Sequence, residues 1–545
     1  MLAIVHNVTA GTRLLDAIDV LASDLRIQVK YTIIGSSAFT AGTWRFLTDR
    51  GIEPLPWDTA VGESFDLAIA ASHGGPLSDI DAPLTILPHG MGYNKLLKPE
   101  TGNRKPETGN RKPETGNRKP ETGNRKPVFG LSPEWLFDGD RLIPSSLVLS
   151  HPEQVERLVA TCPRAAEVAV LAGDTCLDRM SASVALRPSY RRALGCAEDH
   201  RLVLISSTWG PDSLFGAHPD LVSRLVARLP IDDFRVVLSL HPNIVHRHAP
   251  WQIDRWSQAW RRAGVTVLPP EEGWRAAVVA ADVVVGDHGS VTFYGAALGR
   301  PVLLASAPRH AVAPDSAVGR FLTAAPLYDH RRPPAAQLTE AITTHDPTEE
   351  PLASITALAT SAPGQAAALL RSELYRLIEL DEPAEPAGTR AVPIPTAVTT
   401  PPGAQVVLAE PHGADVRITR YPAELMNVDG RLPPGCHLRV DLHEPQRRML
   451  DLAEIVVVPD GRDAAAVLAS MPGCLLATGP VGTDRWLVTD TDGATLLFRG
   501  TIDDGAVWAS VLHAWLDAGH SHTDLPDRLS ATVGRRRYTA TVERG

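Results

Sequence analysis

Four short polar motifs in this 545-residue chain carry side chains that could act on a hydroxyl or a phosphate group. Each motif directly follows an apolar run that is typical of a β-strand. The motifs are His89-Gly90, Ser206-Ser207-Thr208-Trp209, Leu240-His241-Pro242 and Asp287-His288-Gly289-Ser290-Val291. Because ligands bind at the carboxyl ends of parallel strands, we expect all four motifs to line one cleft between two domains.

Histidine and the Gly-Ser turn both suit phosphate chemistry. An imidazole with an ordinary pKa of ~6.5 exists in both protonation states at neutral pH, so His89 and His241 can take up or release a proton. A Gly-Ser turn that opens a helix, as at Gly289 and Ser290, presents free backbone N–H groups and the positive end of the helix dipole to an anion. The same turn also fits an ordinary helix N-cap, and that alternative stays open.

Other polar patterns favour different interpretations. His241, His246 and His248 are close in sequence, but their spacing matches no standard zinc site and no carboxylate or thiolate cluster is near, so we expect no metal. His73 also ends a predicted strand, where a hydrogen-bonded structural histidine is the preferred interpretation. Gly90, Gly92 and Lys95 match neither the GxGxxG pattern nor a complete P-loop, which argues against a nicotinamide enzyme or an ATPase, and we expect no cofactor.

The order of these motifs resembles a known enzyme family. HG after a strand, T-W after a strand, HP, and AD-x-x-x-x-D-x-x-S-V followed by LGRP resemble the CDP-glycerol glycerophosphotransferases of wall teichoic acid synthesis. More broadly they resemble the GT-B superfamily, which includes hydrolysing UDP-N-acetylglucosamine 2-epimerases. The resemblance covers residues 1–380 in architecture and is specific over residues 236–305. It implies a GT-B fold of two tandem Rossmann-like domains, with the nucleotide donor held mainly by the second and the acceptor approaching from the first.

The resemblance also implies roles for individual residues. His89 would be the general base that deprotonates an acceptor hydroxyl, and His241 would hold or protonate the donor phosphate. Asp287 would orient its loop or His288. Glu271 and Glu272, at the start of a predicted helix, would reach a ribose diol or serve only the helix dipole. The expected nucleotide and phosphate site consists of Gly90, Ser207, Thr208, Asp287, His288, Gly289, Ser290 and Val291.

The motifs depart from the family pattern at several positions. Met91-Gly92 follow HG where Thr-Pro is usual, His288-Gly289 replace a tyrosine and a serine, and Gly210 stands where an arginine often follows T-W. These departures leave a nucleotide-sugar donor open beside CDP-glycerol. The hypotheses are a glycerophosphate or sugar transferase in cell-surface polymer biosynthesis, a UDP-sugar glycosyltransferase or 2-epimerase-like enzyme, and a non-catalytic GT-B binding protein.

Two α/β series must position the motifs. Alternating apolar runs and amphipathic stretches predict a first Rossmann-like acceptor domain over residues 1–195 and a second, donor-binding domain over residues 196–380. Residues 381–403 are rich in proline and predict an extended linker. Residues 404–545 predict a small α/β domain of unknown role, with a hairpin that turns at Asp492-Gly493.

Composition narrows the function classes further. With 53 Lys and Arg against 63 Asp and Glu, the net charge is −10, which argues against a broad nucleic-acid-binding surface. The chain opens without a signal-like segment and has no long uncharged apolar run, so we expect a cytoplasmic protein with at most peripheral contact to the inner face of a membrane, for example through a lipid-linked acceptor. Five cysteines without a CxxC pair predict reduced thiols. The fourfold KPETGNR repeat in residues 98–127 predicts a disordered surface insertion.

Overall fold

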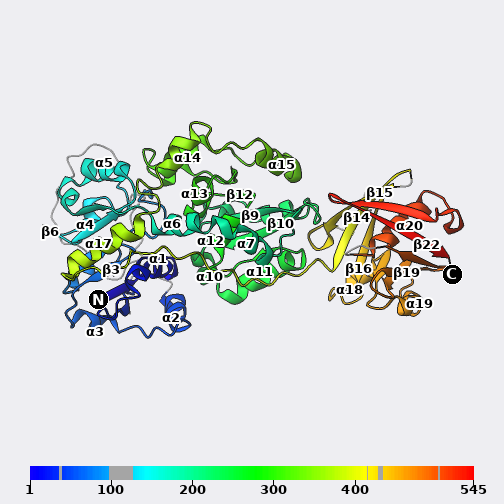
Figure 1. Ribbon diagram of the computed structural model, residues 1–545, viewed down its shortest axis with the longest axis horizontal. Coiled ribbons are helices and arrows are strands. Elements are labelled where there is room, and N and C mark those ends of the chain that lie inside the picture. Colours follow the sequence, from blue (N-terminus) through cyan, green and yellow to red (C-terminus); the bar gives the residue numbers. More distant parts are fainter. Residues whose placement is uncertain are drawn as a thin grey trace.

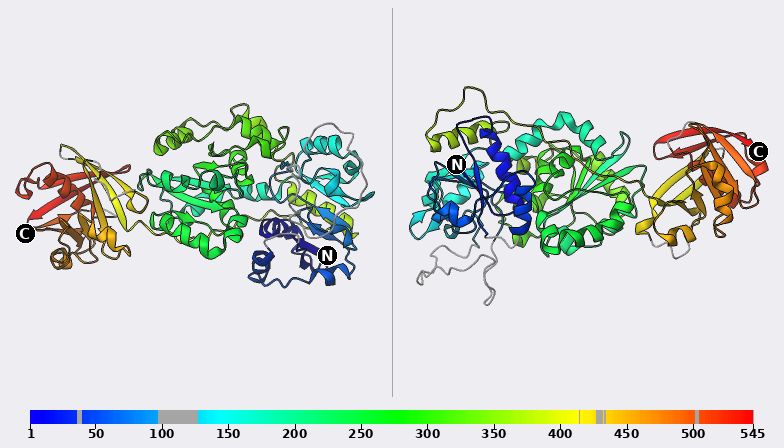
Figure 2. Two further views of the ribbon diagram at one scale, coloured as in Figure 1. Left: turned by 180° about the vertical axis from the view of Figure 1, so that it is seen from behind. Right: turned by 90° about the horizontal axis from the view of Figure 1, so that it is seen from below.

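The computed structural model describes residues 1–35, 40–96, 127–413, 415–426, 432, 434–500 and 504–544. The described part contains two parallel α/β units and a C-terminal unit built on a closed sheet, and the second α/β unit lies in the middle of the row (Figures 1 and 2). The KPETGNR repeat and the expected serine N-cap at residues 36–37 lie outside the described residues.

The first unit is built on a parallel sheet with strand order β2-β1-β3-β4-β7-β8. Its central strand β1 (Leu2–Val5) is apolar and buried along its whole length, as expected for a parallel strand covered on both faces. Helix α1 (Val8–Ile18) begins at Asn7, whose side chain accepts a hydrogen bond from the N–H of Ala10. The other strands are β2 (Lys30–Ile33), β3 (Ala68–Ala70), β4 (Leu84–Ile86), β7 (Ser146–Leu149) and β8 (Ala169–Leu171).

The remaining elements before the second sheet are short. The helices are α2 (Thr40–Thr48), α3 (Trp57–Val61), α4 (Pro133–Leu136), α5 (Pro152–Thr161), α6 (Thr175–Ala182) and α7 (Arg187–Ala193). Strands β5 (Phe137–Asp138) and β6 (Arg141–Leu142) form a separate antiparallel ribbon. The run at residues 128–130, which the sequence indicates as a strand, is a turn with a single bridge from Val128 to Leu96.

The second unit has the strand order β11-β10-β9-β12-β13, again parallel throughout. The expected strands are confirmed as β9 (Arg201–Ser207), β10 (Phe234–Leu240), β11 (Thr266–Val267), β12 (Val283–Gly286) and β13 (Val302–Leu304). Its helices are α8 (Leu214–Ala217), α9 (Leu221–Val226), α10 (Pro242–His248), α11 (Pro250–Arg262), α12 (Trp274–Ala280), α13 (Ser290–Ala297), α14 (Ala317–Ala324), α15 (Pro334–Thr344) and α16 (Leu352–Ala357).

The hydrophobic cores show against which α/β unit two of the helices pack. Tyr190 and Leu194, at and after α7, lie in the core of the second unit. Helix α17 (Ala366–Ile378) returns to the first unit, where Leu370 and Leu374 share a core with Leu14 of α1 (Figure 1). By packing, residues 187–194 lie with the second sheet and residues 366–378 with the first.

The C-terminal unit is a closed sheet with strand order β14-β15-β21-β22-β20-β19-β18-β17-β16. Helix α20 (Val507–Asp517) fills its interior, and the fully buried Trp508 stacks on Phe498 at 5.9 Å between ring centroids. The predicted hairpin is confirmed: β19 pairs with β20 around a turn in which Gly493 has φ +82°. The strands are β14 (Ala404–His412), β15 (Asp415–Pro422), β16 (Cys436–Asp441), β17 (Ile455–Val457), β18 (Leu476–Pro480), β19 (Arg485–Asp490), β20 (Thr495–Arg499), β21 (Arg528–Val533) and β22 (Arg536–Arg544), with helices α18 (Arg447–Asp451) and α19 (Ala464–Ala469).

The proline-rich segment 381–403 is extended, as expected, but it is also attached to the surface. Val392 is buried, its N–H donates to Ser183 Oγ at 2.8 Å, and its carbonyl accepts from the hydroxyl of Tyr190 at 2.6 Å. The five cysteines, all among the described residues, are free thiols. Across the ranges that the structure describes, no helix is both long and apolar enough to span a membrane.

Candidate active site

The loop after β4 and the amino end of α13 meet between the two α/β units. The N–H of Met91 donates to Ser290 Oγ at 2.9 Å. A Cβ atom at Gly90 would lie 2.5 Å from the same oxygen, so this close approach requires glycine. The motif that contains His89 and the motif that contains Ser290 therefore lie side by side, although they come from different sheets.

Three further contacts join the units around this point. On one side the N–H of Leu96 donates to the carbonyl of Ala311 at 3.0 Å, and the N–H of Ala313 donates to the carbonyl of Asn94 at 2.8 Å. On the other side Thr9 Oγ1 lies 3.5 Å from His241 Nε2. The segments that follow β1, β4, β10 and β12 thus face one another between the two units, in the region called the interdomain cleft.

His241 has a fixed orientation at the end of β10. It is the N-cap of α10, and its Nδ1 accepts a hydrogen bond from the N–H of Asn243 at 3.1 Å. Because Nδ1 is an acceptor, the ring proton of the neutral imidazole is assigned to Nε2. Nε2 is the nitrogen that faces Thr9 across the cleft, so His241 presents a hydrogen-bond donor there.

His89 is exposed and lies near two cations. Desolvation lowers the pKa of His89, and the cations Lys95 and Arg13 lower it further. The ring is exposed to water within the cleft, which moderates this shift. One ring nitrogen is hydrogen-bonded to the backbone of Ala71, which opposes the lowering and leaves the other nitrogen as a proton acceptor.

The electrostatic environment of the cleft is positive. Desolvation lowers the pKa of the half-buried His241 to about 3, with further contributions from His89, Lys95 and His246. Lys95 also lowers the pKa of His288, where desolvation is again the main cause. Lys95 is thus a cation that acts on all three histidines, whereas Asp287 and Asp212 raise the pKa of His288.

Lys95 and His6 are site residues that sequence reasoning missed. Lys95 follows the Gly90-Gly92 pattern that was set aside as an incomplete P-loop, yet it acts on all three cleft histidines. His6 directly follows β1, is buried, and donates from Nε2 to the carbonyl of Gly74 at 2.7 Å. Its position after a strand was the available signal, the same one that identified His89.

The Asp287 loop is held by hydrogen bonds within the second unit. The buried carboxylate of Asp287 accepts from the N–H groups of Thr208 at 2.9 Å, Leu214 at 2.8 Å and Gly289 at 3.0 Å. The hydroxyl of Ser207 donates to the carbonyl of Thr208 and accepts from the N–H of Phe215. The hydroxyl of Ser207 is thus hydrogen-bonded within its own unit.

The amino end of α13 is open. Gly289 is its N-cap in an extended conformation, and no described side chain caps it. The first backbone N–H groups of the helix, from Ser290 and Val291 onward, are then left to a ligand or water. His288, beside them, is partly buried and its Nδ1 has no partner among the described residues.

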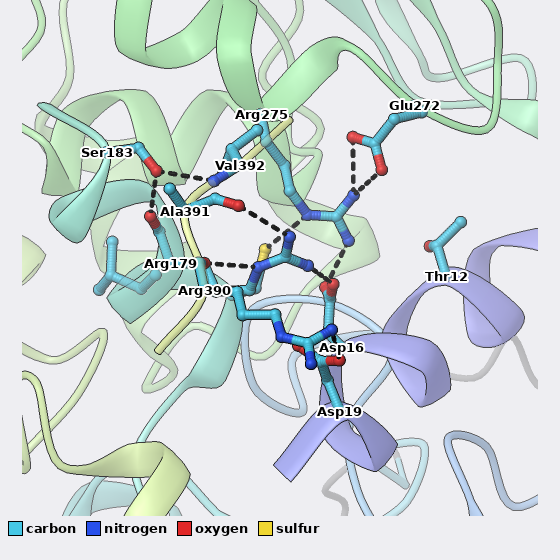
Figure 3. Close-up of polar contacts among 12 residues, drawn as sticks. Thr12, Asp16, Asp19, Arg179, Ser183, Glu272, Arg275, Arg390, Ala391 and Val392 are labelled. Atoms are coloured by element: carbon cyan, nitrogen blue, oxygen red, sulfur yellow. Dashed lines mark hydrogen bonds and ion pairs between the residues drawn. The ribbon is translucent and has the colours of Figure 1, made fainter. Parts of the chain in front are cut away.

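The two glutamates expected near a ribose lie in the segment before α12. Gly273 has φ +92° and α12 begins only at Trp274, so Glu271 and Glu272 precede the helix. Figure 3 shows Glu272 turned toward Arg275, with 3.4 Å between Glu272 Oε1 and Arg275 Nη1. Glu271 acts on His246, whose pKa is lowered mainly by desolvation. The carboxylate of Glu272 thus faces Arg275, and its role toward a ribose stays a prediction.

A metal site is not assembled in the described residues: no group of three or more His, Cys, Asp or Glu is placed to hold an ion. His73 is buried among aromatic rings, with centroid distances of 5.6 Å to Tyr93 and 5.9 Å to Phe129. Desolvation lowers its pKa to about 3, so His73 is a neutral residue behind the cleft.

Two parallel α/β units whose strands end at a shared cleft define a GT-B fold. No family model matches the sequence, and a search of curated proteins finds no relative. Among solved structures, the chain is similar to the wall teichoic acid polymerase TagF, with 13% identity over 70% of this chain and 89% of that chain and a TM-score of 0.44. It is also similar to UDP-GlcNAc 2-epimerase from Neisseria meningitidis bound to UDP-GlcNAc, with 13% identity over 69% and 99% of the chains and a TM-score of 0.38. S. aureus MnaA with UDP matches at 12% identity over 70% and 98% of the chains, with a TM-score of 0.36.

Gly90→Ala tests the contact between the units. The new methyl group would force Ser290 Oγ away and leave the N–H of Met91 without its acceptor, which costs about 1–3 kcal/mol for a buried donor. We expect a lower midpoint of urea unfolding and a higher KM for the nucleotide donor. Gly388→Ala is the matched control, because nothing lies within 4 Å of a Cβ atom at that position. Equal losses in both variants would contradict the steric argument.

Proposed function

We propose that this protein is a GT-B transferase that moves a glycerophosphate or sugar unit from a nucleotide diphosphate donor, such as CDP-glycerol, to an acceptor hydroxyl in cell-surface polymer biosynthesis. The observation that carries the proposal is the pairing of His89 and His241, one from each unit, in a cleft with Lys95 and the open amino end of α13. The motif order supports the donor and acceptor classes.

The two histidines suit complementary roles in this reaction. The neutral ring of His89 takes the proton from the acceptor hydroxyl, and the acceptor oxygen forms a bond to the phosphorus of the transferred glycerophosphate. The bond from that phosphorus to the bridging oxygen breaks, and a nucleoside monophosphate leaves. The Nε2–H of His241, Lys95 and the first N–H groups of α13 stabilise the negative charge on the phosphates. Transfer of a sugar would release a nucleoside diphosphate instead.

The environment of the histidines favours transfer over epimerisation. A hydrolysing 2-epimerase-like reaction calls for acid and base carboxylates at the cleft, whereas the charges that act most on His89 and His241 are positive. Positive groups instead stabilise a diphosphate and its leaving group. We therefore place the transferase before the epimerase-like alternative.

Product analysis tests the proposal. The full chain is incubated separately with CDP-glycerol and with UDP-sugars, each with an alcohol acceptor, and the nucleotides are separated by chromatography. Release of CMP supports glycerophosphate transfer, and release of UDP with a glycosylated acceptor supports sugar transfer. An epimerised sugar supports the epimerase-like alternative. Thermal stabilisation by these nucleotides without any product would support a non-catalytic binding protein and overturn the transferase.

The pH dependence follows from the lowered pKa of His89. A base works only when unprotonated, and a lowered pKa keeps the ring neutral until the pH falls below its ordinary value. We expect kcat/KM, which reports the free enzyme, to stay level from about pH 8 through 6.5 and to fall only at lower pH, toward the lowered pKa of about 4. Lys95→Gln removes one repelling cation and should move the acid midpoint upward. A midpoint above about 6.5 in the unaltered protein would contradict this assignment.

A further inference from the structure

A cavity of about 800 Å³ lies between the second α/β unit and the closed sheet. This volume is within the ~300–1,000 Å³ of typical small-molecule sites. Its walls come from the amino end of β10, the end of α11, linker residues 400–403 and the facing strands β14, β15 and β16. Figures 1 and 2 show that this junction lies at the far end of the second unit from the first unit.

The cavity is separate from the candidate active site. Strand β10 carries Arg235 near its amino end, at the cavity, and His241 follows its carboxyl end, at the cleft. The six residue steps between them correspond to roughly 20 Å along an extended strand. A ligand of the cavity would therefore not contact the catalytic groups.

Ion pairs across the junction fix the distance between the cavity walls. Arg420 Nε donates to Asp232 Oδ2 at 2.9 Å, and Arg262 Nη2 donates to Glu424 Oε1 at 2.6 Å. The N–H of Ile231 also donates to the carbonyl of Arg420 at 2.9 Å. Because these contacts join the two units directly beside the cavity, it is a bounded site.

Arg235 stands out among the four arginines that line the cavity. Arg262 pairs with Glu424, and both Arg420 and Arg439 pair with Asp504. Arg235 has no ion pair with any described carboxylate. Its Nε donates a hydrogen bond to the carbonyl of Leu194 at 3.3 Å.

The charge of Arg235 is costly where it lies. Desolvation lowers its pKa to about 10, so the guanidinium is still charged at neutral pH. A partly buried cation without a counter-ion is unfavourable unless an anion compensates it. Nearby, Nη1 of the buried Arg439 also has no partner among the described residues. The uncompensated charge of Arg235 indicates a missing anionic group, and Nη1 of Arg439, whose guanidinium already pairs with Asp504, offers one further hydrogen-bond donor.

The other lining residues define the rest of the ligand. Apolar surface comes from Val226, Leu229, Phe234, Val265, Pro401 and Pro402. On the facing wall Asp441 and Glu444 disfavour a polyanion. The cavity therefore suits one anionic group beside an apolar body.

We propose that this cavity binds a small organic anion, with its phosphate or carboxylate on Arg235 and its apolar or aromatic body against Phe234 and the linker prolines. Arg235 offers two guanidinium nitrogens in a planar fork, which matches both kinds of anion. The site is independent of the proposed transferase activity.

Calorimetry on the full chain tests the site, with phenyl phosphate and benzoate as probes and benzyl alcohol as the uncharged analogue. We expect saturable binding of at least one anion and none of the alcohol, and the better anion identifies the group that Arg235 takes. Arg235→Gln should weaken binding at least about tenfold. Arg235→Lys, which keeps the charge but loses the fork, should weaken it less and guards against misfolding of the glutamine variant.

Matched variants separate this site from other cationic surfaces. Arg228→Gln makes the same charge change at an exposed position of the second unit outside the cavity lining, and it should leave the affinity unchanged. Lys95→Gln, in the cleft, should also leave it unchanged. Absence of saturable binding, an affinity unaffected in Arg235→Gln and Arg235→Lys, or loss of binding in Lys95→Gln would overturn the proposal.

Discussion

His89→Ala is expected to lower kcat for transfer by about 10²–10⁴-fold, which is the typical contribution of a positioned general base. The reason is that His89 is the cleft imidazole whose second nitrogen is free to accept a proton, since the first is bonded to the backbone of Ala71. Donor binding should change little, because Lys95 and the amino end of α13 remain. The measurement is kcat under saturating donor, together with donor affinity from calorimetry.

The His241 variants separate a base from a phosphate-binding role. His241→Ala removes the Nε2–H group and should reduce both donor affinity and kcat, whereas His241→Gln retains a side-chain N–H and should recover part of the loss. His412→Ala is the control, because His412 is exposed on β14 in the C-terminal unit. Full activity in His89→Ala would refute the proposed base, and equal activity of the two His241 variants would refute the hydrogen-bonding role.

The sheets of the α/β units could be predicted because parallel strands covered on both faces appear as apolar runs. Val283–Gly286 became β12 and Phe234–Leu240 became β10, each with the expected motif directly after it. The unit to which a helix attaches could not be predicted this way. The pattern of α17 shows which of its faces is buried, but not that this face returns to α1.

In the C-terminal unit the strands that the sequence did not predict are β15, β18, β21 and β22. Arginines at positions 536, 537 and 544 dominate the exposed side of β22, and only Ala540 and Val542 are buried. This leaves too little apolar alternation for sequence reasoning to detect a strand. The sheet closes through the pairing of β22 with β20 and β21. The predicted small α/β domain therefore included the hairpin but not the closed sheet.

Within the cleft, the residue types were predictable but the directions of short side chains were not. His89 and His241 each follow the carboxyl end of a parallel strand, which is the end where such sheets bind ligands. The order of strands and loops therefore predicts that both lie at the cleft. Ser207 lies at the correct strand end, yet its hydroxyl bonds within its own turn. Lys95 was hidden because its approach to the histidines depends on the pairing of residues 94–96 with residues 311–313 of the other unit.

Asp16→Leu is expected to lower the free energy of unfolding by about 3–5 kcal/mol, the usual cost of removing one partner from a buried ion pair. Asp16 lies on α1 of the first unit and accepts from Arg275 Nη2, on α12 of the second, at 2.5 Å; it also pairs with Arg179 (Figure 3). The side chain of Arg275 is only 2% exposed, so water cannot replace the lost carboxylate, and the more distant Glu272, at 3.4 Å, is the carboxylate that remains beside it. The midpoint of urea unfolding measures the effect.

The neighbouring pair of Asp19 and Arg390 provides the matched control. Their side chains are 26% and 66% exposed, and exposed pairs contribute only about 0–1 kcal/mol. Asp19→Leu should therefore change stability little, although it removes the same charge from the same part of the chain (Figure 3). Equal destabilisation by Asp16→Leu and Asp19→Leu would show that burial is not the cause.

A double variant separates two effects of removing Asp16: the lost attraction to Arg275, and the cost of burying the Arg275 guanidinium without Asp16. In Asp16→Leu/Arg275→Leu the buried guanidinium is removed together with its partner. Replacing both members of a buried ion pair by apolar groups often leaves the free energy of unfolding nearly unchanged. We expect the double variant to be more stable than Asp16→Leu alone, with Arg179, 16% exposed, keeping part of its hydration. Because Asp16 and Arg275 join α1 to α12, Asp16→Leu should also raise the KM of the donor by loosening the cleft. A double variant less stable than Asp16→Leu would mean that the pair stabilises the interface by attraction and not merely by mutual neutralisation.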